Sequence, residues 1–278
     1  MKKQNEVTVN RKYKDKIFCK LFGSEEYKEN LLSLYNALNN SNHTDLDCLE
    51  INTLDDALYM NYKNDVSIIC EAENIMSLYE HQSTYSPNMP LRGVDYFAQL
   101  YAKYIGKEKH KLYGSKRLSI PTPKYYVFYN GMKEFDDITI LKLSDMYDGE
   151  GDLECTATMI NINQGHNIEL LNKCSALMEY SKFVSKVYHN MAKYDSMEEA
   201  IDTTVSECIN EGILEKFLTS HEAEVKGMLY DEYNQEEHMK YIKEETVLSM
   251  LEKEMITIEQ AAEVLEVSPE EIKKMITS

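Results

Sequence analysis

The fold is decided by two runs of sequence, Asp65-Val66-Ser67-Ile68-Ile69-Cys70 and Ile75-Met76-Ser77-Leu78-Tyr79-Glu80-His81-Gln82. Both runs are rich in apolar and β-branched residues, and only the polar residues 71–74 lie between them. Two such runs joined by a short polar turn are typical of a β-hairpin. We therefore predict two antiparallel strands over this stretch.

The predicted hairpin brings two acids together. A turn centred in the middle of residues 71–74 puts Asp65 opposite Glu80, with their Cβ atoms about 5 Å apart. Gln82 lies two residues beyond Glu80 and projects on the same face, whereas His81 points to the opposite face. A shift of one residue would turn one acid away, so this site depends on the register.

Two carboxylates at this separation repel each other by about 3 kcal/mol at an effective dielectric constant near 20. Protonation of one acid or a bound cation relieves the repulsion, and hard oxygen ligands favour Mg²⁺. Asp15 is a third candidate ligand, because its spacing to Phe18 and Phe22 places it on the apolar stripe of the first helix, where an acid needs a partner. Each acid also has a structural interpretation. Asp15 can be a helix-start residue, Asp65 a strand-edge or turn residue after Asn64, and Glu80 a solvated cross-strand partner.

The rest of the chain predicts a mixture of helices and strands. Helices are expected over residues 17–22, 24–38, 90–105, 168–187, 197–218, 222–230 and 236–254, and further strands over 124–129 and 153–163, with a short extended piece near 49–51. This order is that of an α/β or α+β protein. We divide the chain into a core (1–195), a helical extension (196–254) and a small tail resembling a helix-turn-helix (255–278).

Composition excludes several classes of protein. The chain has 278 residues, of which 43% are hydrophobic and 28% charged, so it is not collagen-like, low-complexity or mostly disordered. It contains no apolar run of about 20 residues, the length that spans a bilayer, and the first residues carry no secretory signal. A cytoplasmic protein without membrane contact is expected. The six isolated cysteines predict small core residues rather than a disulfide framework or a zinc ribbon.

The net charge of −18 is unevenly distributed, and residues 103–124 carry seven basic side chains against a single acid, Glu108. Because salt screens exposed charges beyond about 8 Å, a local basic surface can bind a polyanion on an acidic chain. Solvated lysines are the alternative interpretation. In the tail, acids at the start of the last helix would repel phosphate, which favours self-association or protein binding there, such as a homodimer, over DNA binding.

Three segments of the sequence resemble a known family: Asn64-Asp65-Val66-Ser67, Tyr79-Glu80-His81-Gln82-Ser83-Thr84 and Pro87-Asn88-Met89-Pro90-Leu91-Arg92. They resemble the Rpn family of recombination-promoting nucleases, also described as PD-(D/E)XK nuclease family transposases. Supporting matches occur in order over roughly residues 10–230, at residues 15–18, 121–124, 127–131, 143–145 and 161–163.

The resemblance implies a restriction-endonuclease-like core, a mixed sheet flanked by helices, that cleaves DNA phosphodiesters with the help of a metal. Asp65 matches the D of the motif, Glu80 the (D/E) and Gln82 the K position, while Asp15 falls in the helix that often supplies an extra acid. A glutamine in place of lysine can only form hydrogen bonds. This form resembles one that the family itself carries.

The resulting hypothesis is a DNA endonuclease in which Asp65, Glu80 and the His81 carbonyl hold Mg²⁺ or Mn²⁺ and Gln82 orients a water. Arg92 is expected to contact a phosphate or to pair with Asp95 or Glu80. Further DNA contacts are expected from Lys103, Lys107, Lys116 and Arg117. The alternative is a catalytically inactive DNA-binding or regulatory protein of the same fold.

Overall fold

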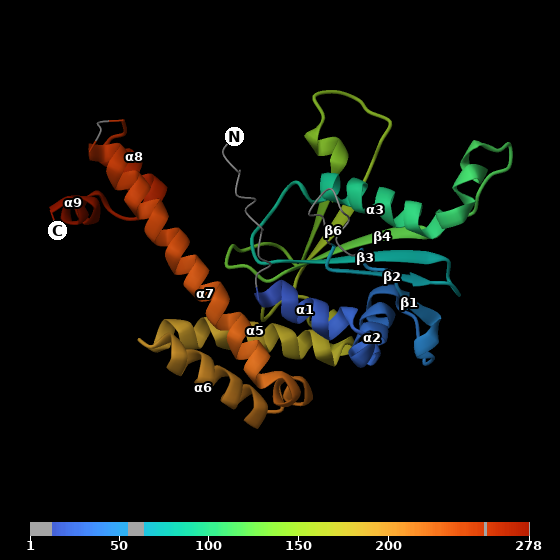
Figure 1. The fold of residues 1–278 in the computed structure, drawn as a ribbon, viewed down its shortest axis with the longest axis horizontal. Helices are drawn as coiled ribbons and strands as arrows, with labels where there is room; N and C mark the ends of the chain where they lie inside the picture. The colour runs from blue at the N-terminus through green and yellow to red at the C-terminus, as the bar shows by residue number, and fades with distance from the viewer. Residues whose placement is uncertain (1–12, 55–63, 253–254, 278) are drawn as a thin grey trace, which may run out of the picture. The chain divides into compact units, whose positions relative to one another are not determined.

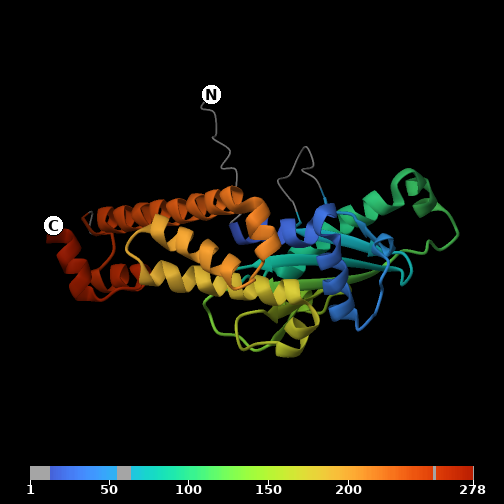
Figure 2. The same cartoon turned by 90° about the horizontal axis from the view of Figure 1, so that it is seen from below.

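A computed structural model describes residues 13–54, 64–252 and 255–277. The chain divides into two compact units, Met1–Lys226 and Gly227–Ser278. This division differs in position from the boundaries after residues 195 and 254 that the sequence suggested. The reason is packing, because α6 (Met197–Asn210) lies against α5 (Ser175–Lys193) in the first unit, as Figure 2 also shows.

In the described part of the first unit, six strands form one mixed sheet in the order β1-β2-β3-β4-β6-β5 (Figure 1). They are β1 (Leu49–Ile51), β2 (Val66–Cys70), β3 (Ile75–Gln82), β4 (Thr122–Tyr129), β5 (Ile138–Lys142) and β6 (Thr156–Asn161). β1, β2 and β3 are antiparallel neighbours, β3, β4 and β6 run parallel, and β5 closes the edge antiparallel to β6. The chain is thus an α/β protein with a mixed sheet flanked by helices.

Helices cover both faces of this sheet (Figure 1). α3 (Met89–Ile105) connects β3 to the parallel strand β4 and covers one face. α1 (Tyr13–Gly23), α2 (Lys28–Asn39) and α5 lie on the other face. Two short helices, η3 (Gly106–Tyr113) and α4 (Ile168–Lys173), follow α3 and β6, and α7 (Glu215–Glu252) runs from the first unit into the second.

The alternation of side chains along β3 separates two layers of the core. Met76 and Leu78 pack with Leu100 of α3 in one cluster. On the other face, the ring of Phe18 in α1 lies 5.3 Å from that of Phe128 and 5.6 Å from that of His81, measured between centroids. Because successive strand residues point to opposite faces, this packing directs Glu80 toward α3 and the His81 ring toward α1.

The elements expected from the sequence are found with four differences. The helices predicted over 222–230 and 236–254 are parts of the single helix α7. The predicted helix over 168–187 is two helices, α4 and α5, because Cys174 between them has extended backbone angles (φ −132°, ψ 94°). The helix that begins at Met197 ends at Asn210, before Gly212 with φ 71°, and a helix starts again at Glu215. The edge strand β5 was not predicted.

The second unit has a small apolar core of its own. α8 (Ile258–Leu265) and α9 (Pro269–Thr277) are joined by residues 266–268, within the tail that the sequence predicted to resemble a helix-turn-helix. Val247, Ala261 and Ile272 are buried together. Thr257 and Gln260 form a capping box at the start of α8. Self-association through this unit stays a prediction.

Among the residues that the structure describes, no helix has both the length and the apolar character needed to cross a membrane.

Gly93 sets how closely α3 approaches the sheet. A Cβ at this position would lie 2.6 Å from Cε1 of Tyr125, well inside van der Waals contact. We expect Gly93→Ala to lower the free energy of unfolding by about 1 to 3 kcal/mol, the usual cost of overpacking a core. Urea denaturation followed by circular dichroism measures this change.

The matched control is Gly227→Ala in α7. At Gly227 a Cβ would meet no atom of the described residues within 4 Å. Alanine there is expected to stabilise the helix by about 0.5 to 1 kcal/mol. If Gly93→Ala leaves the free energy of unfolding unchanged, α3 does not pack on β4 as described.

Candidate active site

The register of the hairpin is the one that the sequence predicts. Val66 pairs with Tyr79, so Asp65, just before β2, lies opposite Glu80 in β3. The backbone N–H of Asp65 donates to Oε1 of Glu80 at 3.0 Å, and the backbone N–H of His81 donates to Oδ2 of Asp65 at 2.7 Å. Each acid therefore accepts a hydrogen bond from the opposite strand.

Both acids are buried, with exposed fractions of 7% for Asp65 and 1% for Glu80. A buried carboxylate is stable only with hydrogen bonds or a compensating positive charge. Arg92, in the first turn of α3, provides that charge, since its Nη2 lies 2.8 Å from Oε2 of Glu80. Of the two pairings considered for Arg92, the structure forms the one with Glu80, while Asp95 accepts a hydrogen bond from Gln99.

Tyr96 completes the group of side chains around Glu80. Nη2 of Arg92 also lies 3.1 Å from the Tyr96 hydroxyl. Burial, and next the negative charge of Glu80, raise the pKa of Tyr96 to about 12. Burial alone would lower the pKa of Arg92, but Glu80 and Tyr96 outweigh this effect and raise the pKa above its usual value. At neutral pH Arg92 is therefore charged and Tyr96 protonated.

Gln82 is the last residue of β3 and shares the face of Glu80. Its backbone carbonyl accepts a hydrogen bond from the N–H of Asn130 at 3.2 Å, which fixes the strand end against β4. The side chain is half-buried, and its amide has no hydrogen-bond partner among the residues that the structure describes. The amide is thus available to a ligand beside the two acids.

The His81 ring lies on the other face of the sheet and is fully buried. Its Nδ1 is 2.7 Å from Oδ1 of Asp15, and its Nε2 is 3.2 Å from the hydroxyl of Tyr180 in α5. An acid on the apolar stripe of α1 needs a partner, and the partner of Asp15 is His81. The structure therefore does not bring Asp15 together with Asp65 and Glu80.

Among the basic residues expected to bind DNA, Arg92 pairs with Glu80, whereas Lys103, Lys116 and Arg117 lie along and beyond the rest of α3. Lys103, near the end of α3, contacts the backbone carbonyls of Asn52 and Thr53 at 3.3 and 3.1 Å. Lys116 and Arg117 are exposed and follow η3, so they lie beyond the far end of α3 from Arg92, a helix about 25 Å long. The side chain of Lys107 lies outside the described part of the chain.

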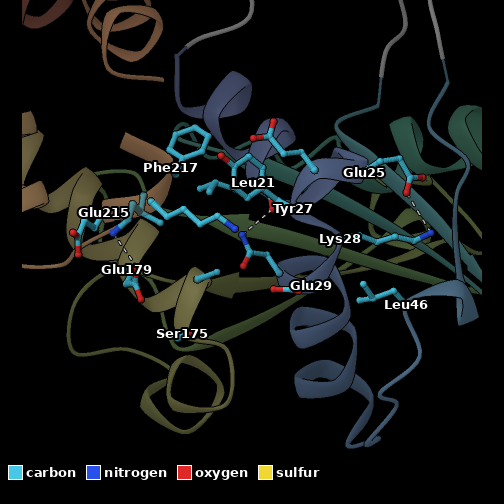
Figure 3. A pocket seen from close by; sticks show the side chains of 15 residues that line it. Leu21, Glu25, Tyr27, Lys28, Glu29, Leu46, Ser175, Glu179, Glu215 and Phe217 are labelled. Atoms are coloured by element: carbon cyan, nitrogen blue, oxygen red, sulfur yellow. Dashed lines mark hydrogen bonds and ion pairs between the residues drawn. The ribbon is translucent and has the colours of Figure 1, made fainter. Parts of the chain in front are cut away.

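A pocket of about 260 Å³ lies elsewhere in the first unit (Figure 3). Its walls come from α1, α2, α5 and the start of α7, and its lining includes Tyr27, Glu179 and Phe217 but no residue of the predicted site. Glu179 there accepts a hydrogen bond from the backbone N–H of Leu214 at 2.8 Å. The pocket therefore adds nothing to the chemistry of the hairpin acids.

Comparisons of the chain with protein-family models, with curated proteins and with solved structures each found no match.

Sequence reasoning missed two tyrosines that contact the site residues. Tyr96 follows Arg92 by four residues, so the two share one face of a helix, and this spacing was a readable signal. Tyr180 contacts His81 although the two residues are 99 positions apart in the sequence. The sequence around Tyr180 gives no indication of this contact.

The ion pair between Arg92 and Glu80 is expected to stabilise the fold. Breaking a buried pair costs about 3 to 5 kcal/mol, and because the Arg92 side chain is 35% exposed, we expect Arg92→Met to cost about 2 kcal/mol. In a Glu80→Gln background the same substitution should cost less than about 1 kcal/mol, because no charge is left unpaired. Urea denaturation of the four proteins gives the coupling energy. Additive costs would contradict the pairing.

Proposed function

We propose that this chain is a metal-dependent DNA endonuclease of the PD-(D/E)XK type, similar to the Rpn family. The observation that carries the proposal is the convergence of Asp65 and Glu80 at one end of the hairpin, with Gln82 on the same face. Three residues that the resemblance assigns to the motif thus share one end of the hairpin. The mixed sheet flanked by helices is compatible with the core that the resemblance implies.

The donor set fits a hard divalent cation. The two buried carboxylates accept hydrogen bonds from the backbone, and one of them pairs with a guanidinium. Carboxylate oxygens are the ligands that Mg²⁺ and Mn²⁺ prefer. Asp65, Glu80 and the backbone carbonyl of His81 are the proposed ligands. When bound, the ion lowers the pKa of a coordinated water and stabilises negative charge on the phosphate.

The side chains around the acids have separate tasks in this proposal. Gln82 orients the attacking water through its amide, which can accept and donate hydrogen bonds. Arg92 holds Glu80 in place, and its guanidinium keeps further N–H groups for a phosphate oxygen, which is typical of arginine at phosphate sites. Tyr96, protonated at neutral pH, donates a hydrogen bond without adding negative charge beside the DNA.

A second candidate is a DNA-binding protein of the same fold that does not cleave. The Arg92–Glu80 ion pair favours it, because a guanidinium already neutralises the acid that a metal would need. The glutamine at position 82, which cannot supply the positive charge of a lysine, points in the same direction.

A supercoiled-plasmid nicking assay distinguishes the two candidates. We expect nicking in the presence of Mg²⁺ or Mn²⁺ and none in EDTA. Asp65→Asn and Glu80→Gln keep the size of each side chain but remove its charge, and each should lower the nicking rate about 100-fold or more. The matched control is Glu50→Gln, an exposed acid on β1 of the same sheet, which should nick like the unaltered protein.

Equal nicking by all four proteins would place the activity elsewhere or in a contaminant, and would contradict the proposal. Plasmid binding without nicking under either metal would support the non-cleaving candidate instead.

A further inference from the structure

A second group of ligand atoms lies at the other end of the hairpin. β2 ends at Cys70, and Glu73 lies in the turn that leads to β3. His43, in the loop after α2, reaches the same place. One donor atom from each side chain, the His43 ring nitrogen, the Cys70 Sγ and a Glu73 carboxylate oxygen, lies within 4.8 Å of the other two.

The carboxylate and the imidazole already share a hydrogen bond. Nε2 of His43 is 2.7 Å from Oε1 of Glu73, and the Tyr35 hydroxyl donates to Oε2 at 2.6 Å. The hydrogen bond from Tyr35 orients the carboxylate, in the way that hydrogen bonds to metal-binding carboxylates orient them.

The loop that carries His43 is fixed to α2 by Asn36. Nδ2 of Asn36 donates to the backbone carbonyl of His43 at 2.8 Å, and the backbone N–H of His43 donates to Oδ1 of Asn36 at 3.0 Å. Cys70 is fully buried and held in the sheet between Leu49 and Ile75. The backbone at His43 and at Cys70 is therefore held in place by hydrogen bonds.

We propose that His43, Cys70 and Glu73 form a zinc site. Thiolate, imidazole and carboxylate are all ligands of Zn²⁺, whereas a thiolate disfavours Mg²⁺. Ligand atoms bound to one tetrahedral zinc at about 2.0 to 2.3 Å lie about 3.5 Å apart. The donor atoms now lie within 4.8 Å of one another, so zinc binding requires a contraction of about 1 Å at most.

A solvent molecule would complete the four-coordinate zinc, and Cys48 lies close to Cys70. Cys48 directly precedes Leu49, the partner of Cys70 in the sheet. His43 and Glu73 are partly exposed, so the ion has a path from solvent. On binding, the Cys70 thiol loses its proton, and zinc replaces the hydrogen bond between His43 and Glu73. The site then ties the loop after α2 to the hairpin turn, at the end of β2 away from Asp65.

Competition with a chromophoric zinc chelator measures the affinity of the full-length protein after EDTA treatment and dialysis. We expect one zinc per chain, and we expect His43→Ala and Glu73→Gln to weaken binding at least ~10-fold. Cobalt(II) in place of zinc should show a thiolate-to-metal absorption band that Cys70→Ser abolishes. Zinc should also raise the thermal unfolding midpoint of the unaltered protein, and less so that of the variants.

Two control variants separate this site from the rest of the molecule. Asp65→Asn removes a hairpin acid, and Cys155→Ser removes a thiol outside the cluster, and neither should change the affinity for zinc. Cys70 is buried, so its variant can misfold. His43 and Glu73 are partly exposed, so their variants test the site without that risk. The proposal would be overturned if the protein did not bind zinc, or if His43→Ala and Glu73→Gln left zinc binding unchanged. A disulfide between Cys48 and Cys70 would also overturn it.

Discussion

Two buried carboxylates at the end of the β2–β3 hairpin each accept a hydrogen bond from the backbone of the opposite strand. The Asp65 carboxylate receives the N–H of His81, and the Glu80 carboxylate receives the N–H of Asp65. A register shift of one residue would break both bonds and leave a buried charge without a partner, which is costly. These bonds therefore fix the register, and the register fixes which side chains can meet at the candidate site.

The same alternation gives β3 two different polar environments. On the side of α3, Glu80 pairs with Arg92, and Tyr96 closes the group. On the side of α1 and α5, the fully buried His81 ring lies between Asp15 and Tyr180. We infer that the second environment supports the first, because it holds the strand in place while leaving the oxygens of Asp65 and Glu80 on the α3 face.

The sequence predicted the parts of this structure that depend on local patterns. The hairpin and its register followed from two apolar runs and a four-residue turn, and the helix predicted over 90–105 is α3. The partner of Asp15 depended on tertiary packing between α1 and β3. The edge strand β5 is short, with Ile138 and Ile140 exposed, so it carries no pattern of burial. The cluster of His43, Cys70 and Glu73 joins residues that show no metal-binding spacing.

The most direct test of the central claim is a crystal structure of the protein soaked in Mn²⁺, with anomalous diffraction to locate the metal. The account predicts one anomalous peak about 2.2 Å from a carboxylate oxygen of Asp65 and from one of Glu80, with Arg92 displaced from at least one Glu80 oxygen. A map in which Arg92 keeps its ion pair and no peak lies near either acid would contradict it.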